Sequence, residues 1–314
     1  MDHYALLCLN HHNGGKGWKH HAGWSASVHA KRAPGSHVGW FGVATVSTIN
    51  QRVTAVVLPR NNMVGPLVEE VKWMNDLKAL CFPHNQLSGH IPEGWSSLRS
   101  LTNLDLSNNK ISGPVNESFF SGMKKSRDLR DKSLGLRSLN LGRNQMWGPL
   151  PESLSTLVAL STLNLAHNHF SQALPEALFE CKQLKTLRLS ANKLSGALPA
   201  AFTKLRQLKI LELDENELSG EIGPLPRNLI KVHLQGNRLA RDLPDSLFKL
   251  DGLADLDVSH NYLSGAVSDE IAGLKALRLF HIEGNRHSGA EKALITECIK
   301  NYLPDLVRNQ GFRI

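Results

Sequence analysis

Apolar and polar positions recur at a fixed spacing along most of this chain. In residues 184–199, LKTLRLSANKLSGALP, leucine occupies positions 184, 187, 189, 194 and 198, and Asn192, Gly196 and Pro199 are the other fixed positions. The same pattern returns 24 residues earlier and 24 residues later. Such a period is typical of a repeat protein, in which each copy buries its apolar side chains against the next copy. We therefore expect one elongated repeat domain rather than several globular ones.

Two periodicities within each copy predict its local structure. Leu187 and Leu189 alternate with polar residues, which is the period of a β-strand, so stacked copies should form a parallel sheet. After the proline, apolar residues recur about every third position, as expected for 3₁₀ or short helical segments on the convex side. The predicted fold is an α/β solenoid that curves, because its outer side is wider per copy than its concave sheet. Ten copies begin at Val53, Leu77, Leu101, Leu136, Leu160, Leu184, Leu208, Leu229, Leu253 and Leu277.

An asparagine occupies the same position in every copy. A buried carboxamide can pair with backbone donors and acceptors that a tight bend leaves without partners, so we interpret these residues as scaffold rather than as a site. The ten residues are Asn61, Asn85, Asn109, Asn144, Asn168, Asn192, Asn216, Asn237, Asn261 and Asn285.

The domain boundaries follow from where the pattern begins and ends. Residues 53–289 hold the ten copies, and residues 1–52 lack the pattern and are rich in Gly, His and Trp. We expect residues 1–52 to form an N-terminal cap that starts with a short helix from Tyr4 to Asn10. Residues 290–314 are expected to form a helical cap at the other end, after a degraded copy with His287 where leucine is expected. The residues suited to covering the first copy are Trp18, Trp24, Trp40 and Phe41.

Several copies depart from the pattern. The third copy is 11 residues too long, with the excess in residues 117–135, whose basic residues are Lys124, Lys125, Arg127, Arg130 and Lys132. This insertion is either a functional loop or a tolerated surface loop. The eighth copy begins only 21 residues after the seventh, where GPLPRN replaces the usual outer segment. Gln172 and Arg241 stand at glycine positions, and the residues at proline positions are Asn116, Gly223 and Ser268.

The copies LKALCFPHNQLSGHIP and LKTLRLSANKLSGALP follow L-x-x-L-x-L-x-x-N-x-L-x-G-x-[IL]-P, which resembles the plant-type leucine-rich repeat. GGKGW, GW and WFGV before the first copy look like the N-terminal cap of such proteins. Secreted plant relatives have a pair of cap cysteines where this chain has Val38 and Thr45, so the cap is closer to the cysteine-free caps of algal and protist proteins. The resemblance implies a horseshoe-shaped solenoid that binds proteins or peptides on its concave sheet.

Strand alternation places the positions between the leucines on the concave side. The central column, between the second and third leucines, runs from Val57 and Cys81 through charged and polar residues to His281. Copies four to six are basic and polar, and copies seven to nine are acidic with histidine. These zones favour a charged linear partner or a protein with complementary patches, and the alternative is a merely solvated face. The predicted partner-binding residues are Asp105, Arg137, Asn140, Arg143, Asn164, Lys185, Arg188, Glu212, Asp214, Glu215, His233, Asp255, Asp257, His260 and His281.

Four residues of the central column have the donor atoms of a metal site. Glu212, His233, Asp257 and His281 stand in consecutive copies, and zinc accepts such nitrogen and oxygen ligands. They would equally form imidazole–carboxylate pairs that make binding sensitive to pH. Because nothing outside the column fixes ligand geometry, we predict no metal and no cofactor. We expect the cap histidines to be solvated, since they lack ligand spacing; they are His11, His12, His20 and His21.

Sequence motifs and net charge reduce the number of function classes that fit this chain. The chain has no phosphate loop, no H-E-x-x-H and no G-x-S-x-G, and Asp257 beside His281 lacks a nucleophile, so we expect no enzyme. The formal net charge is +8, but the acidic copies would repel phosphate, which disfavours nucleic acid. We predict a non-catalytic recognition or scaffold module that binds a protein or peptide. The alternative is the ligand-sensing ectodomain of a receptor-like protein, or a secreted inhibitor.

Cysteine usage and hydropathy bear on the compartment. The four cysteines lie far apart in sequence, and no apolar run is long enough for a membrane span. No N-terminal secretion signal is apparent either. These features predict a cytoplasmic protein with isolated thiols, and a secreted or cell-surface protein is the alternative if the N-terminus is incomplete.

Overall fold

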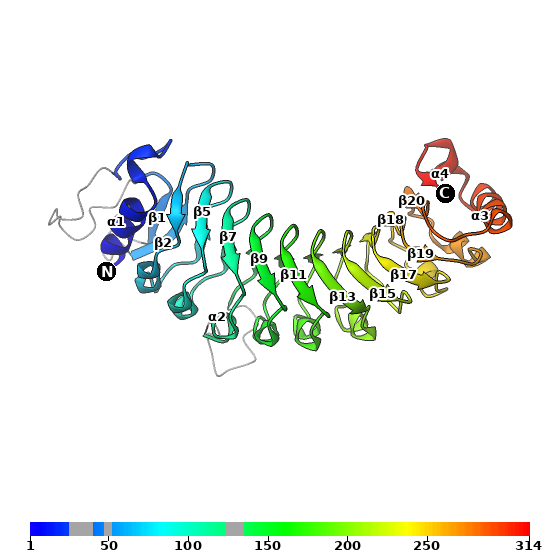
Figure 1. Cartoon of the computed structure of the whole chain (residues 1–314), viewed down its shortest axis with the longest axis horizontal. Helices are drawn as coiled ribbons and strands as arrows, with labels where there is room; N and C mark the ends of the chain where they lie inside the picture. The colour runs from blue at the N-terminus through cyan, green and yellow to red at the C-terminus, as the bar shows by residue number, and fades with distance from the viewer. Residues whose placement is uncertain (25–39, 47–51, 123–134) are drawn as a thin grey trace. The chain divides into compact units, whose positions relative to one another are not determined.

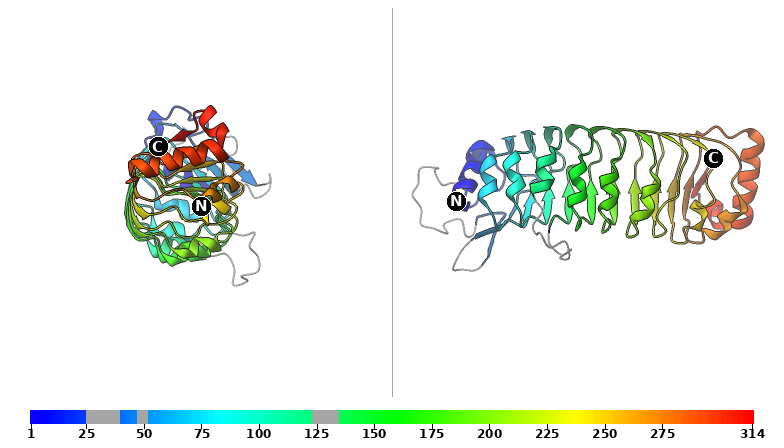
Figure 2. Two further views of the ribbon diagram at one scale, coloured as in Figure 1. Left: turned by 90° about the vertical axis from the view of Figure 1, so that its right-hand side faces the viewer. Right: turned by 90° about the horizontal axis from the view of Figure 1, so that it is seen from below.

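The computed structural model describes residues 1–24, 40–46, 52–122 and 135–314 (Figure 1). The chain divides into two compact units, Met1–Asn168 and His169–Ile314, and each is described by itself. Both are built from the same element order, in which a short strand is followed by a turn, a second short strand and an outer helical segment. The row of helical segments on the outer side of each unit is visible from below in Figure 2. The predicted parallel sheet with 3₁₀ segments is confirmed.

The first unit has two sets of strands. In the main sheet β1 is antiparallel to β2 and the later strands are parallel; the strands are β1 (Val43–Val46), β2 (Arg52–Val57), β4 (Ala79–Cys81), β6 (Asn103–Asp105), β8 (Ser138–Asn140) and β10 (Thr162–Asn164). The second set is parallel and consists of β3 (Val64–Pro66), β5 (Gln86–Gly89), β7 (Lys110–Gly113) and β9 (Gln145–Gly148). The helical segments are α1 (Asp2–His12), η1 (Gly15–Gly17), η2 (Glu69–Trp73), η3 (Glu93–Ser97), α2 (Glu117–Gly122) and η4 (Glu152–Thr156).

The second unit repeats this plan. Its main sheet consists of β12 (Thr186–Arg188), β14 (Ile210–Glu212), β16 (Lys231–His233), β18 (Asp255–Asp257), β20 (Leu279–His281) and β21 (Phe312–Arg313). Its second set of strands is β11 (His169–Gln172), β13 (Lys193–Ala197), β15 (Glu217–Gly220), β17 (Arg238–Arg241) and β19 (Tyr262–Leu263). The helical segments are η5 (Glu176–Glu180), η6 (Ala200–Lys204), η7 (Leu247–Lys249), η8 (Asp269–Gly273), α3 (Gly289–Tyr302) and α4 (Pro304–Arg308).

The leucine positions form the core because the strands pair in register. Leu211 of β14 lies opposite Leu187 and Val232, and all three side chains are fully buried. Burying an aliphatic side chain of this size contributes roughly 1.5–3 kcal/mol, so one column of leucines stabilises both the copy and its contact with the next. The alternate positions along each strand are left on the opposite side of the sheet.

The repeated asparagine ties successive copies together, as predicted. Asn216 Oδ1 accepts a hydrogen bond from Leu194 N at 3.0 Å, and Asn216 Nδ2 donates to the carbonyls of Leu189 and Leu213, both at 3.0 Å. Two of these partners belong to the preceding copy and one to its own copy. A single amide therefore pairs backbone groups that the bend would otherwise leave buried without partners.

The residue before each repeated asparagine adopts the left-handed conformation in all ten copies. Glycine fills this position in only two copies, so the bend holds ordinary side chains at positive φ. The ten residues are Arg60, His84, Asn108, Arg143, His167, Ala191, Glu215, Gly236, His260 and Gly284.

The tryptophans of the N-terminal region pack as expected. Trp18, Trp24 and Trp40 are buried, and the Trp24 ring lies 4.9 Å from each of the other two ring centroids. Phe41 was expected to join them, but it is 40% exposed and its ring stacks on His20 at 4.8 Å. That expectation is wrong because Phe41 lies in the turn before β1, where its carbonyl rather than its ring contacts Trp24.

The end of the chain contains the predicted helices and a strand that was not predicted. α3 begins with a capping box in which Ser288 and Glu291 exchange hydrogen bonds, and α4 follows it. The chain then returns to the sheet, and Phe312 in β21 pairs with Phe280 in β20. Within the insertion, α2 is anchored by buried Phe119 and Phe120, whereas the basic residues from Lys124 to Lys132 lie outside the described residues.

Candidate functional site

One column of charged side chains crosses the exposed side of the main sheet in the second unit. The pairing places Arg188 next to Glu212, Glu212 next to His233, His233 next to Asp257, and Asp257 next to His281. All five residues are half-buried. These five predicted residues therefore lie side by side, one on each of five consecutive strands.

Glu212 is the centre of the first group of ion pairs. Its carboxylate lies 2.7 Å from Arg188 Nε and 3.0 Å from Lys231 Nζ, and its side chain is only 15% exposed. Lys231 also lies 3.8 Å from Asp255 Oδ2. Lys231 was not among the residues predicted from the sequence. It occupies the same position in β16 as the predicted residue Asp255 does in β18, so strand alternation could have identified it.

The two histidines pair with different carboxylates. His233 Nε2 lies 3.1 Å from Asp255 Oδ2, and His281 Nδ1 lies 3.4 Å from Asp257 Oδ2. Glu212, Asp255 and Asp257 thus each have a nitrogen partner. We call this set the charge ladder; it consists of Arg188, Glu212, Lys231, His233, Asp255, Asp257 and His281. Its charges are more balanced than the acidic zone expected from the central column, because Lys231 lies between two carboxylates.

The other predicted residues of the second unit lie at the rim of the sheet. Asp214 accepts a hydrogen bond from Ser190 Oγ. Glu215 and His260 hold the left-handed bend, with φ of 54° and 52°. Lys185 is exposed and immediately precedes the residues of β12. Among the residues that the structure describes, these side chains flank the charge ladder and form no ion pair with it.

In the first unit the predicted polar residues stabilise their own turns. The Oδ1 atoms of Asp105, Asn140 and Asn164 accept hydrogen bonds from the backbone N–H two residues later, at 3.0, 3.2 and 3.1 Å. This local bond is the reason why Asp and Asn are favoured at turns. Arg137 and Arg143 are exposed beside them. The predicted polar residues of this unit therefore stabilise the turns as well as contribute to the exposed surface.

The geometry around Asp257 bears on catalysis and on metal binding. Ser259 Oγ donates to Asp257 Oδ1 at 2.7 Å, and His281 contacts the other carboxylate oxygen. A nucleophilic triad instead requires the histidine between the serine and the carboxylate, so this arrangement does not activate Ser259. Within the described ranges, no three His, Cys, Asp or Glu side chains are grouped to hold a metal ion.

The cap histidines His11, His12, His20 and His21 are exposed.

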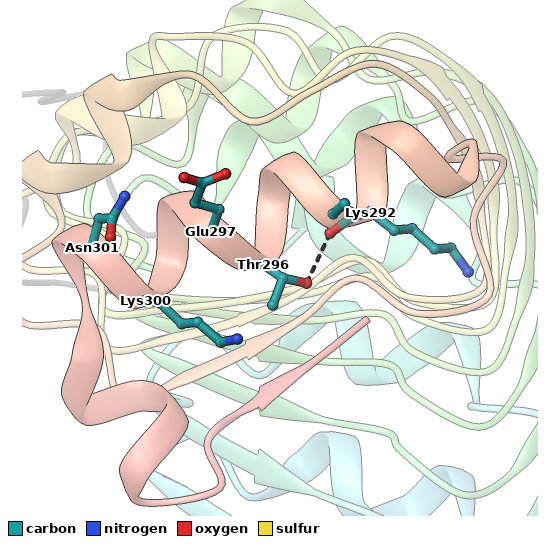
Figure 3. Close-up of a pocket in the computed structure, with 6 residues that line it drawn as sticks. Lys292, Thr296, Glu297, Lys300 and Asn301 are labelled. Atoms are coloured by element: carbon teal, nitrogen blue, oxygen red, sulfur yellow. Dashed lines mark hydrogen bonds between the residues drawn. The ribbon is translucent and has the colours of Figure 1, made fainter.

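A hollow of about 430 Å³ lies along α3, between Lys292 and Asn301 (Figure 3). Every residue that lines it comes from this one helix, and Thr296 Oγ1 donates within the helix to the Lys292 carbonyl at 2.8 Å. With no group converging from another element, the hollow has no features of a binding site.

Two leucine-rich repeat families match the sequence. One matches residues 227–286, and the other matches residues 100–121, 135–157, 159–181 and 183–205. No match was found among curated proteins. The matched ranges fall within the ten copies of the pattern.

Solved structures of plant proteins share the fold. The ectodomain of the Arabidopsis thaliana membrane receptor kinase GASSHO1/SCHENGEN3, in complex with CASPARIAN STRIP INTEGRITY FACTOR 2, is 28% identical with a TM-score of 0.73, over 80% of this chain and 29% of that chain. The plant peptide hormone receptor RGFR1, in complex with RGF2, is 27% identical with a TM-score of 0.63, over 77% of this chain and 40% of that chain. The chain thus spans well under half of these receptor chains.

A plant ice-binding protein matches along nearly its whole length. It is 28% identical with a TM-score of 0.75, over 92% of this chain and 87% of that chain.

The prediction of a cytoplasmic protein is wrong, because structural neighbours such as the GASSHO1/SCHENGEN3 ectodomain belong to plant receptors and point to a secreted or cell-surface location. The physical reason for the error lies in the cap. Packing of Trp18, Trp24 and Trp40 holds it together, so the lack of a cysteine pair says nothing about the redox compartment. None of the described helices has the length and apolar character to cross a bilayer.

Proposed function

We propose that this leucine-rich repeat protein is a non-catalytic recognition module, and that it binds a peptide or protein on the exposed side of its main sheet. The observation that carries the proposal is the charge ladder on five adjacent strands of the second unit. The receptors GASSHO1/SCHENGEN3 and RGFR1, which share this architecture, were solved in complex with CASPARIAN STRIP INTEGRITY FACTOR 2 and RGF2, respectively. The proposed partner is therefore extracellular.

The charge ladder is suited to recognition because its side chains are held in place before a ligand arrives. Arg188 uses Nε to contact Glu212 and its side chain is still 40% exposed, so we propose that the rest of the guanidinium contacts a ligand carboxylate. Lys231 and Asp255 are likewise 31% and 25% exposed. Side chains fixed by neighbours lose little conformational entropy on binding. We propose a ligand of mixed charge whose affinity falls as salt rises.

A charge swap tests this proposal. The variant Arg188→Glu/Glu212→Arg keeps the composition but inverts the pattern presented to a partner. Tagged wild type and variant would be used to capture partners from native extracellular extract, after circular dichroism has shown that both are folded. We expect partners of the wild type to be lost from the variant.

A second swap provides the matched control. Arg238 and Glu217 form an ion pair at 3.0 Å between β17 and β15, outside the main sheet. Arg238→Glu/Glu217→Arg should retain the same partners as wild type. If both swaps capture the wild-type partners equally, the main sheet does not bind them and the proposal fails.

Ice binding is a second candidate, favoured by the match to the plant ice-binding protein along nearly its whole length. A surface that matches an ice lattice needs the same group repeated at regular spacing. Here the strand positions of the second unit carry Arg188, Glu212, His233 and Asp257 in turn, which gives no such repeat. We therefore expect no thermal hysteresis in a freezing-point measurement, and a clear hysteresis gap would replace the first proposal with this one.

A further inference from the structure

The outer side of the second unit has a gap where one copy is short. The copies that precede and follow it carry η6 (Ala200–Lys204) and η7 (Leu247–Lys249) on this side. Between β15 and β16 the described chain has no helical segment, because GPLPRN replaces it. Three missing residues correspond to about one turn of 3₁₀ helix. The two neighbouring segments therefore flank a notch.

The notch is a cavity of about 610 Å³ with walls from three copies. Arg206 comes from the first wall and Lys249 from the opposite wall, and Arg227 lies on the segment between them. Buried Leu225, Pro226 and Leu250 also line it. An adjoining hollow of about 460 Å³ shares Arg227 and Lys249 and adds Lys209 and Asp251. We call this whole region the outer notch.

The floor of the outer notch is fixed in place. Pro224 and Pro226 each restrict the backbone φ, and Leu225 is buried. Asn228 Nδ2 donates to the Arg206 carbonyl at 2.7 Å, which ties the floor to one wall. The cationic side chains are thus carried by a rigid frame rather than by a free loop.

The charges of the outer notch are unbalanced. Arg206, Lys209, Arg227 and Lys249 are all exposed, and Asp251 is the single carboxylate among the lining residues. Across the described residues none of these four cations forms an ion pair. The charge ladder of the same unit differs, since there every carboxylate has a nitrogen partner. The cations repel one another, and a bound anion would reduce this repulsion.

We propose that the outer notch binds the phosphate or sulfate group of an organic monoester. Two guanidinium groups offer planar, paired donors that match a tetrahedral oxyanion, and Lys249 adds a third charge. The apolar floor formed by Leu225, Pro226 and Leu250 seats the organic part beside the anion. This site is separate from the peptide-binding face proposed above and does not depend on it.

Titration calorimetry with phenyl phosphate, phenyl sulfate and inorganic phosphate tests this site on the full chain. We expect both phenyl esters to bind, and more tightly than inorganic phosphate because only they contact the apolar floor. The tighter of the two esters identifies which oxyanion the site prefers. Binding should weaken as sodium chloride rises, and the ligands should raise the thermal midpoint of the protein.

Matched variants locate the binding. Arg206→Gln/Arg227→Gln should raise the Kd for phenyl phosphate at least tenfold. Arg238→Gln/Arg308→Gln removes the same charge from exposed residues outside the notch and should leave the Kd within twofold. Equal weakening in the two variants would show a general charge effect and overturn the proposal. Absence of binding by wild type at millimolar phenyl phosphate and phenyl sulfate would also overturn it.

Discussion

At Arg241 and Gln172 the backbone adopts a conformation for which other copies use glycine. Their φ angles are 75° and 70°, close to 82° at Gly196 and 80° at Gly220. A side chain in this left-handed region costs roughly 1–2 kcal/mol through contact of Cβ with the following carbonyl oxygen. The pairing of the flanking strands therefore enforces the bend even where the residue disfavours it.

Replacing Arg241 by glycine should stabilise the protein. We expect Arg241→Gly to raise the free energy of unfolding by about 0.5–1 kcal/mol, which is the relief of strain less the extra entropy of glycine in the unfolded chain. Urea unfolding followed by circular dichroism measures it. Arg241→Ala is the control, because it removes the same exposed side chain and keeps Cβ; an equal gain from alanine would contradict the explanation.

The reverse change should destabilise. At Gly220 a Cβ would lie 3.5 Å from Ala197 Cβ, so there is room for it and only the backbone conformation is unfavourable. Gly220→Ala should lower the free energy of unfolding by about 1 kcal/mol in the same assay. No change in stability would mean that the turn relaxes without strain.

Single residues also show what the sequence can reveal about the site. Arg188, Glu212 and Asp257 were found from strand alternation alone, because their position in the repeat dictates the side on which they lie. Which partner each one contacts was not predictable. His233 pairs with Asp255 rather than with its aligned neighbour Asp257, because side-chain rotamers and not register decide such contacts.

At the scale of elements, the inserted helix α2 is joined to the next copy by Glu117. Its carboxylate accepts hydrogen bonds from the backbone N–H groups of Glu152 at 2.8 Å and Ser153 at 2.7 Å, at the start of η4. Partial burial raises the pKa of Glu117, but the hydrogen bonds from Ser153 and Glu152 outweigh it and lower the pKa overall. The ionised form is thus favoured in the folded protein.

Glu117→Gln should cost about 1 kcal/mol of stability near neutral pH, the typical value of a carboxylate at a helix start. Since the folded-state pKa is depressed, the contribution of Glu117 is present above the unfolded pKa and is lost as pH falls through the folded pKa. Wild type and variant should therefore converge in stability as the pH falls through the folded pKa of Glu117, which lies below the ordinary pKa of glutamate. Glu176→Gln, at the start of η5, is the control, and a pH-independent difference for Glu117→Gln would refute the role of ionisation.

The strand β21 closes the sheet through a close approach of the backbone. Phe280 N donates to the Gly311 carbonyl at 2.6 Å and Ile282 N to the Arg313 carbonyl at 2.9 Å. A Cβ at Gly311 would lie 2.0 Å from the Arg278 carbonyl oxygen. Gly311→Ala should therefore detach β21 and remove hydrogen-exchange protection from the amides of Phe280 and Ile282. Protection equal to that of wild type would show that the backbone shifts without releasing the strand.

The elements differ in how far the sequence predicts them. The 3₁₀ segments could be predicted from the spacing of apolar residues. This holds even for η8, which begins after Ser268 instead of proline; there the Ser268 hydroxyl accepts a hydrogen bond from Glu270 N at 3.1 Å. The strand β21 has only two residues and no alternation, so no local pattern indicates it. It forms because the edge of β20 offers unpaired backbone groups, which is a tertiary cause.

At the scale of the whole molecule, the cysteines led sequence analysis to the wrong compartment. None of the four, all of which the structure describes, forms a disulfide, and Cys8, Cys181 and Cys298 are buried. Cysteine count indicates an oxidising compartment only where disulfides replace a hydrophobic core, as in small secreted domains. A repeat protein buries a leucine column in every copy and needs no such bonds. The structural neighbours, rather than composition, point to a secreted or cell-surface location.

Thiol reactivity tests whether the folded protein tolerates an oxidising environment. Burial raises the pKa of Cys181 to about 12 and that of Cys81 to about 11, since a low-dielectric surrounding disfavours the thiolate. At pH 8 the thiolate fraction falls roughly a thousandfold and a hundredfold relative to the ordinary thiol. A disulfide reagent should therefore leave both residues unmodified in native protein and modify both in urea. Addition of dithiothreitol should leave the thermal midpoint unchanged, because no disulfide contributes to it. Rapid modification of half-buried Cys81 in the native state would show that its thiolate is accessible, and the fold would then not protect its thiols in a secreted protein.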